Sequence, residues 1–290
     1  MALSRPTTVP AMRLVVQHPT LAAEAVTAFS KWLGRGPSRC DPGVATWDRV
    51  EQSRDEVAAL AQSVQVDAAL VPQEARLGDY RLLAFDMDST LITIECVDEI
   101  ADYAGCKAEV AAITEAAMRG EIPDYDESLR RRVALLAGLD VAVLDRVFDE
   151  RLRLSPGAEA LIDAACALGL KTLLVSGGFT DFTERLKAQL GLDYTCSNTL
   201  EVVDGKLSGK VLGRIVNAEA KAQALLETSR ALGFTPAQAI AVGDGANDLK
   251  MMAIAGVSVA YHAKPVVRAQ TTYAVSYSGL DAVLNLLPVV

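Results

Sequence analysis

The stretch Asp86–Thr90, with the sequence DMDST, decides the fold of this chain. It directly follows the apolar run Leu82–Phe85 (LLAF), which predicts a buried strand. In an open α/β sheet, the carboxyl ends of the strands face the ligand crevice. We therefore expect Asp86 and Asp88 at that edge, where two neighbouring carboxylates can divide their roles. One attacks or binds a metal, and the other transfers protons.

A spaced pair of acids also opens the calcium loop of an EF-hand. That loop needs Gly at its sixth position and Glu at its twelfth. Counted from Asp86, these positions hold Leu91 and Val97, so we reject a calcium loop. The D-x-D-x-T pattern also occurs by chance, and the catalytic interpretation therefore depends on motifs further along the chain.

The composition indicates a globular protein with an acidic surplus. The chain has 290 residues, enough for one large or two medium domains, and 51% of them are hydrophobic. Its net charge of −9 argues against a generic nucleic-acid binder. A small anionic substrate stays compatible, because a bound cation and a few donors can reverse the field locally.

The sequence shows neither a membrane span nor the pattern of a signal peptide. The five cysteines form no C-x-x-C pair and are odd in number, so we expect small buried or partly buried thiols in a reducing compartment. The expectation is a cytoplasmic protein that binds neither nucleic acid nor membrane.

Residues 1–79 are predicted to form a small α+β module, for which an ACT-like fold is one option. It is expected to contain a strand, a helix, a loop, a helix and a strand, over residues 12–16, 20–33, 34–43, 50–62 and 66–71. The module carries no catalytic pattern. Two interpretations stay open: a packing or dimerisation element, which would make the protein a homodimer, and a regulatory site that senses an amino acid.

The rest of the chain alternates strands and helices after a long helical insertion. Apolar spacing and Ala content predict several helices from about 95 to 154. Strands are then expected at 171–175, 239–242 and 257–259, helices at 156–169, 181–190, 218–232 and 248–255, and β-segments over 193–212 with a turn at Asp204-Gly205. This alternation implies a parallel sheet with right-handed crossovers. The insertion would lie above the strand ends as a cap over the crevice.

Two features suit a phosphoryl group. Ser176–Gly178 (SGG) follows the strand that ends at Val175, and a hydroxyl with exposed backbone N–H groups before a helix suits a phosphate cradle. An ordinary turn is the alternative. Lys221 lies in the first turn of the helix that begins near Ala218. A solvated surface lysine is the default, and only the other motifs favour a fixed cation for a phosphoryl group.

Gly243–Asp248 (GDGAND) follows the strand at 239–242. A dinucleotide fingerprint would end in Gly where this chain has Asp248, and acids in that loop would repel a pyrophosphate. We interpret the stretch as a metal loop. The carboxylates of Asp244 and Asp248, with Asn247 as a polar contact, suit Mg²⁺.

In this order, the four motifs resemble those of the haloacid dehalogenase superfamily phosphatases, and the match covers roughly residues 81–290. Within the superfamily the chain is similar to the phosphoserine phosphatase family, because of Glu95, Ser128–Val133 (SLRRRV) and Phe179 after the Ser-Gly-Gly motif. One departure is that 118–125 (MRGEIPDY) is one residue longer than usual, with Tyr125 where Phe is common.

The resemblance implies an α/β fold: a Rossmann-like parallel-sheet core over 80–92 and 156–290, and a helical cap over 93–155. It also implies Mg²⁺-dependent hydrolysis of O-phosphoserine to serine and phosphate, the last step of serine biosynthesis. Asp86 would be the nucleophile that forms an aspartyl-phosphate, and Asp88 the acid and then the base. The implied metal ligands are Asp86, Asp244 and the backbone carbonyl of Asp88, with Asp248 in support, and the implied substrate-binding residues are Glu95, Arg132, Ser176, Gly177, Lys221 and Asn247.

Glu95 can pair with the ammonium of phosphoserine and Arg132 with its carboxylate. Helical spacing places Arg132 on the apolar stripe of Leu129, Val133 and Leu136, away from its two arginine neighbours. Two alternatives remain. The same chemistry would serve another small phosphomonoester, such as phosphohomoserine or a sugar phosphate. A non-catalytic regulatory protein would be expected to lack Asp86, which is present.

Overall fold

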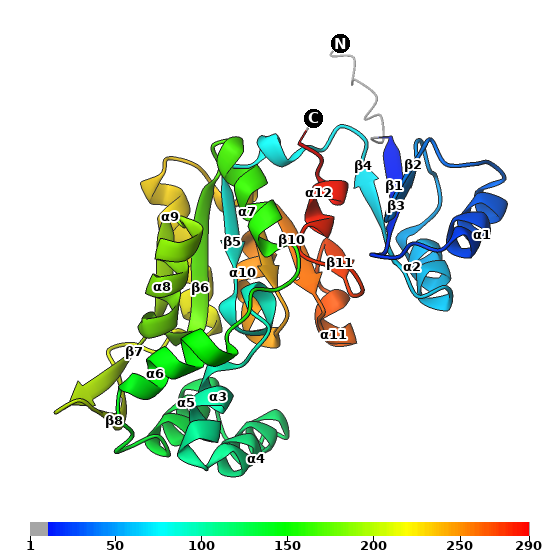
Figure 1. The fold of residues 1–290 in the computed structure, drawn as a ribbon. Coiled ribbons are helices and arrows are strands. Elements are labelled where there is room, and N and C mark those ends of the chain that lie inside the picture. Colours follow the sequence, from blue (N-terminus) through cyan, green and yellow to red (C-terminus); the bar gives the residue numbers. More distant parts are fainter. Residues whose placement is uncertain (1–10, 290) are drawn as a thin grey trace.

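The computed structural model describes residues 11–289, and these form two sheets (Figure 1). The smaller sheet is antiparallel, with the order β2-β3-β1-β4. Its strands are β1 (Met12–Gln17), β2 (Arg39–Asp41), β3 (Val44–Trp47) and β4 (Asp67–Pro72), and its helices are α1 (Ala23–Leu33) and α2 (Arg54–Ser63). Both helices pack on one face of this sheet, over a core that includes Phe29 and Trp47.

The predicted loop at 34–43 is wrong in part, because it contains β2, and β3 was not predicted at all. Pro42 and Gly43 form the turn between these short strands, with Gly43 at φ 81°. Because Pro and Gly are typical of turns, the sequence around them predicts a loop even where two short strands flank the turn. Helix α2 begins later than predicted because Ser53 caps it: its side chain accepts a hydrogen bond from the N–H of Glu56, whose carboxylate accepts one from the N–H of Ser53.

The larger sheet has seven strands in the order β11-β10-β9-β5-β6-β7-β8. They are β5 (Leu82–Phe85), β6 (Lys171–Phe179), β7 (Tyr194–Val203), β8 (Lys206–Leu212), β9 (Ala239–Gly243), β10 (Val257–Tyr261) and β11 (Tyr273–Val275). All neighbours are parallel except β7 and β8, which the predicted turn at Asp204-Gly205 joins as an antiparallel hairpin. β5 is the middle strand and fully buried, as expected of a parallel strand covered on both faces. The α/β prediction is confirmed.

The helices of the larger unit are α7 (Ala158–Ala167), α8 (Thr180–Leu190), α9 (Ala218–Ala231), α10 (Leu249–Ile254), α11 (Pro265–Arg268) and α12 (Ala282–Leu286). β11, α11 and α12 were not predicted, because they are too short to show a hydrophobic period. None of the helices in residues 11–289 combines the length and the apolar composition that crossing a bilayer requires.

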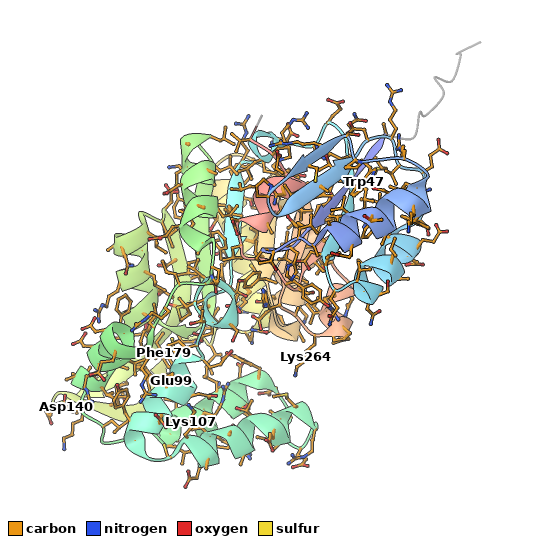
Figure 2. The ribbon with its side chains drawn as sticks, turned by 45° about the vertical axis from the view of Figure 1, so that its right-hand side comes forward. Trp47, Glu99, Lys107, Asp140, Phe179 and Lys264 are labelled. Carbon is orange, nitrogen blue, oxygen red and sulfur yellow. The ribbon has the colours of Figure 1, made fainter. Side chains whose placement is uncertain are left out.

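The segment between β5 and β6 is helical, as predicted. It contains α3 (Cys96–Ala104), α4 (Lys107–Met118), α5 (Tyr125–Ala134), α6 (Ala142–Arg146) and a π-helical turn at Val147–Arg151. In Figure 1 these helices gather at one end of the larger sheet, and Figure 2 shows Phe179, at the end of β6, beside them. The insertion therefore lies next to the carboxyl ends of the strands.

The cysteines are all unpaired, as expected. The expectation that they are at least partly buried is wrong for two of them. Cys40 and Cys166 are exposed, because the first lies on the edge strand β2 and the second on an outward position of α7.

A buried carboxylate joins the smaller sheet to the larger unit. Asp67, at the start of β4, accepts hydrogen bonds from the backbone N–H groups of Ser276 (2.6 Å), Tyr277 (3.1 Å) and Ser278 (2.9 Å). Asp67 is only 4% exposed. Three backbone donors of one loop therefore depend on a single side chain from a distant part of the sequence.

We expect Asp67→Ala to lower the free energy of unfolding by about 3 kcal/mol, since it leaves buried N–H groups without an acceptor. Urea denaturation of the purified protein measures this change. Glu51→Ala, which removes an exposed acid of the same region, should leave the unfolding midpoint within error. Equal midpoints for both variants would show that the Asp67 contacts contribute nothing to stability.

Candidate active site

A cavity of about 1160 Å³ lies between the carboxyl ends of the central strands and the helices α3 to α5. Seven of the predicted site residues line it: Asp86, Asp88, Glu95, Arg132, Gly177, Asp244 and Asn247. The other three, Ser176, Lys221 and Asp248, are completely buried behind the wall. The sequence motifs thus converge on one site. Its first layer of residues lines the cavity, and its second layer is buried behind the first.

The first layer begins where β5 ends. Asp86 accepts a hydrogen bond from the N–H of Met87 (2.7 Å), and its own N–H donates to the carbonyl of Val242 on β9 (3.0 Å). The following turn is tight, with Ser89 at φ 56°. Thr90 is fully buried and donates to Asp244 Oδ1 (3.0 Å). The threonine of the motif therefore orients a carboxylate of the distant Gly243–Asp248 loop, a role that spacing in the sequence does not show.

Lys221 is the cation of the second layer. Its Nζ lies 2.6 Å from Asp86 Oδ1 and 2.7 Å from Asp248 Oδ1. Burial alone would lower the pKa of Lys221, but the charges of both carboxylates raise it above its ordinary value. The lysine is thus held charged in the interior, and the default of a solvated surface lysine is wrong. Lys221 reaches this position from the first turn of α9. The helix starts there because the Asn217 side chain caps it and accepts a hydrogen bond from the N–H of Ala220 (3.1 Å).

Three carboxylates crowd together in front of this lysine. One oxygen from each of Asp86, Asp244 and Asp248 lies within 4.8 Å of the others. Burial, followed by the charge of Asp248, raises the pKa of Asp86 well above its usual range and that of Asp244 to about 6. One lysine does not balance three acids, and hard carboxylate oxygens are the donors that Mg²⁺ prefers. The donor set therefore fits a divalent cation.

Asp88 interacts with a different acid, Glu95. Its carboxylate accepts from the N–H of Cys96 (3.4 Å) and is not part of the three-acid cluster. Burial and then the charge of Glu95 raise the pKa of Asp88 to about 7. Glu95 accepts a hydrogen bond from the hydroxyl of Ser89 (2.7 Å), and burial raises its pKa as well. A carboxyl that titrates near neutrality can both donate and accept a proton at physiological pH.

The predicted phosphate cradle differs from the expectation in two respects. β6 does not end at Val175 but continues to Phe179, with an irregular register between those residues. The Ser176 hydroxyl accepts from the N–H of Gly178 (2.8 Å) and does not reach the cavity. An added side chain would crowd this turn: a Cβ on Gly178 would lie 2.6 Å from Met87 Cε and would have to displace that methyl group. Of the two glycines, Gly177 presents its backbone to the cavity, and the hydrogen bond between Ser176 and Gly178 holds the turn behind it.

Sequence reasoning missed Asn198, on β7. Its amide nitrogen donates to the carbonyl of Gly177 (2.7 Å), and its amide oxygen accepts from the N–H of Val216 (2.8 Å). It is 1% exposed. Asn is uncommon inside strands, so an Asn in a β-pattern was the available signal, but nothing in the sequence named its partner.

Arg132 lines the cavity from α5, and its guanidinium lies 6.0 Å from the centre of the Tyr125 ring. Arg130 and Arg131 instead pair with Asp126 and Glu127, one turn earlier on the same helix, and are more than half exposed. This is the separation of faces that helical spacing predicted. Among the described residues, Lys264 is the other lysine or arginine of the cavity lining, and it follows β10 (Figure 2). Its Nζ lies 3.6 Å from the sulfur of Met118 on α4.

Comparison with known proteins identifies relatives of this chain. A model of the haloacid dehalogenase-like hydrolases matches residues 83–253. The phosphoserine phosphatase of Polaromonas sp. (strain JS666) is 59% identical over 234 residues, which cover 78% of this chain and 99% of that protein. The crystal structure of a probable phosphoserine phosphatase from Vibrio cholerae, in unliganded form, has a TM-score of 0.82 at 39% identity and covers 96% of this chain and 86% of that one.

A second similar structure is described as a phospho-aspartyl intermediate analogue of phosphoserine phosphatase. It has a TM-score of 0.67 at 37% identity and covers 72% of this chain and 99% of that chain.

Proposed function

The chain belongs to the haloacid dehalogenase-like hydrolase family as a phosphatase, and we propose that it hydrolyses O-phosphoserine to serine and phosphate. One observation carries the proposal. A single cavity joins Asp86, which is backed by a buried lysine, to an acid and an arginine on the facing helices, Glu95 and Arg132. These are the groups that a phosphate, an ammonium and a carboxylate on one small molecule require.

In the first step Asp86 attacks phosphorus. Met87 N–H and Lys221 hold its Oδ1, which leaves Oδ2 to form the new bond. The bond from phosphorus to the serine oxygen breaks, and Asp88 gives that oxygen its proton. In the second step Asp88 takes a proton from water, whose oxygen attacks phosphorus and releases phosphate from Asp86. Covalent catalysis of this kind divides one difficult hydrolysis into two easier steps.

Mg²⁺ is the proposed cofactor. Asp86, Asp244 and the backbone carbonyl of Asp88 would hold it. Asp248, whose oxygens already contact Lys221 and the N–H of Gly245 (2.7 and 3.0 Å), would support the site. When bound, the ion supplies positive charge that offsets the repulsion between Asp86 and an anionic phosphate.

Metal binding has a readout that does not involve activity. Mg²⁺ at about 100 times its Kd should stabilise the metal-free protein by about 2.7 kcal/mol, and thermal unfolding in the presence and absence of the ion measures this. Asp244→Asn should remove most of the shift, whereas Asp163→Asn, an exposed change on α7, should keep it. An equal shift in both variants would place the ion elsewhere.

The non-phosphate end of the cavity would set the substrate. Glu95 pairs with the ammonium group, and Arg132 pairs with the carboxylate. Ser176 and Gly177 shape the phosphate end, with Asn247 on its rim and Lys221 behind Asp86. The reaction would be the last step of serine biosynthesis in the cytoplasm. We assign this reaction to a catalytic core of residues 80–92 and 156–290 together with a cap of residues 93–155. The described part of residues 1–79 is a separate packing module in this proposal.

Arg132→Ala tests this substrate. We expect kcat/KM for phosphoserine to fall by about 100-fold or more, since a charged, bidentate contact is lost. Hydrolysis of p-nitrophenyl phosphate, which has no carboxylate for Arg132 to bind, should change by less than about threefold, a difference of less than about 0.7 kcal/mol. Arg131→Ala, on the outer face of α5, is the matched control. Equal losses on both substrates would remove Arg132 from recognition.

A panel that includes phosphohomoserine and sugar phosphates decides between phosphoserine and the other small phosphomonoesters. Phosphoserine should give the highest kcat/KM with Mg²⁺. A higher value for another member would replace the proposed substrate while keeping the chemistry.

A further inference from the structure

Lys264 lies where the cavity opens to solvent. It stands between β10 and α11, lines the cavity and is exposed. Figure 2 shows its side chain reaching from the larger unit toward the helical insertion, where its Nζ meets the sulfur of Met118 at 3.6 Å. A thioether sulfur is a weak, neutral acceptor. Lys264 takes part in none of the lysine ion pairs within residues 11–289, so its charge is free to act on a solute.

The backbone that carries Lys264 is fixed on both sides. His262 has φ 47°, in the left-handed region that is strained for a residue with a side chain. Its N–H donates to the carbonyl of Val275 (2.7 Å), and its ring nitrogen Nε2 lies 2.9 Å from the carbonyl oxygen of Ser278. Pro265 restricts the other side, because its ring disfavours the helical region for the preceding residue. The lysine therefore projects from a fixed point of the rim.

The cavity behind this lysine is acidic. Among the described residues, eight acidic side chains line it, against two basic ones, Arg132 and Lys264. Three of the eight are paired with cations outside the lining, which are Lys221, Arg130 and Lys250. Five acids therefore face two cations, and a single Mg²⁺ would not remove this surplus. A cleft lined by one sign of charge focuses its field, so this one repels an approaching anion.

The proposed substrate is such an anion. A phosphomonoester carries a charge of about −2 on its phosphate near neutral pH. In the proposed function Arg132 binds the carboxylate of the substrate, and Lys221 is buried behind Asp86. Among the described cations of the lining, Lys264 is thus the one left for the phosphate to meet as it enters.

We propose that Lys264 is the entry cation of the active site. It attracts the phosphate of an incoming phosphomonoester at the cavity opening and offsets the repulsion of the acidic lining. The inference rests on the proposed function only in requiring a phosphomonoester dianion as the substrate. A charge at the rim of a binding site acts on capture and depends on salt. Lys264 therefore lowers KM and leaves kcat unchanged.

A charge series at this position measures the effect. At about 0.02 M ionic strength we expect kcat/KM to fall about threefold in Lys264→Gln and about tenfold in Lys264→Glu, through KM, whereas Lys264→Arg stays near the parent value. These sizes follow for one and two unit charges that act on a dianion about 8 Å away in water. At about 1 M salt, where the Debye length is about 3 Å, every variant should agree with the parent within about 1.5-fold.

Lys210→Gln is the matched control, because Lys210 is an exposed lysine on β8 outside the cavity lining. Its kcat/KM should equal that of the parent at both salt concentrations. An unchanged kcat/KM in Lys264→Gln at low salt would overturn the proposal. So would a loss that persists at high salt or that lies in kcat, since either would make the role of Lys264 structural.

Two substrates separate attraction of the phosphate from recognition of the carboxylate. Phosphoserine and p-nitrophenyl phosphate should lose equally in Lys264→Gln, because both present a phosphate dianion. A loss confined to phosphoserine would assign Lys264 to the carboxylate and overturn the proposal. If the parent protein did not hydrolyse phosphoserine, the proposed substrate would fail, and the series with p-nitrophenyl phosphate would still decide the role of Lys264. The two failures are therefore distinguishable.

Discussion

Asp86→Asn is expected to lower kcat by about 10⁴-fold or more, the range seen when a nucleophile is removed. The amide is a poor nucleophile, and its neutral group also loses the charge that pairs with Lys221 at 2.6 Å. The shape is preserved, because Asn still offers an oxygen to the N–H of Met87. The variant should therefore fold, and steady-state release of phosphate from phosphoserine measures the loss.

Asp163→Asn is the control for this substitution, since it makes the same chemical change on the exposed face of α7. Its kcat should equal that of the parent. A parental rate in Asp86→Asn would mean that the phosphoryl group never passes to this side chain.

Lys221→Met should affect both stability and catalysis. Lys221 is fully buried between Asp86 and Asp248, at 2.6 and 2.7 Å. Removing one partner of a buried charge cluster costs about 3–5 kcal/mol, because the remaining charges are left uncompensated. Loss of a fixed cation beside the reacting carboxylate should also lower kcat by about 10²–10³-fold, as removal of other aimed electrostatic groups does. Urea denaturation and phosphate release measure the two effects.

Lys250→Met provides the comparison, since Lys250 also pairs with an acid, Glu219, but both side chains are more than half exposed. That variant should behave like the parent, as exposed pairs contribute little. In Lys221→Met/Asp248→Asn one of the stranded charges is removed as well. We expect stability to recover in part and activity to stay low. Full activity in the double variant would show that Lys221 serves folding alone.

The parts of the site that were predictable are those encoded locally. The apolar run Leu82–Phe85 before Asp86 gave both the strand and its functional end, because a short apolar strand followed by polar residues is readable within one window. The helix that carries Lys221 was predictable in the same way. Arg132 could be separated from its arginine neighbours because the faces of a helix follow from spacing alone.

What could not be predicted depends on contacts between distant segments. The burial of Lys221 follows from Asp86 and Asp248, which only the folded sheet brings beside it. The continuation of β6 to Phe179 follows from the pairing of Phe179 with Asn198 on β7, beyond an irregular stretch at Ser176–Gly178, and glycines give no strand signal. The carbonyl that Asn198 binds and the loop that Asp67 holds likewise belong to other elements. Such partners have no local pattern.

The central claim is that Asp86 carries the phosphoryl group during turnover. Rapid acid quenching of the protein with phosphoserine and Mg²⁺, followed by peptide mass mapping, tests it most directly. We predict one added phosphoryl group on the peptide that contains Asp86, at Asp86 itself, and none in Asp86→Asn. Turnover in which that peptide stays unmodified, or in which another side chain carries the phosphoryl group, would contradict the account.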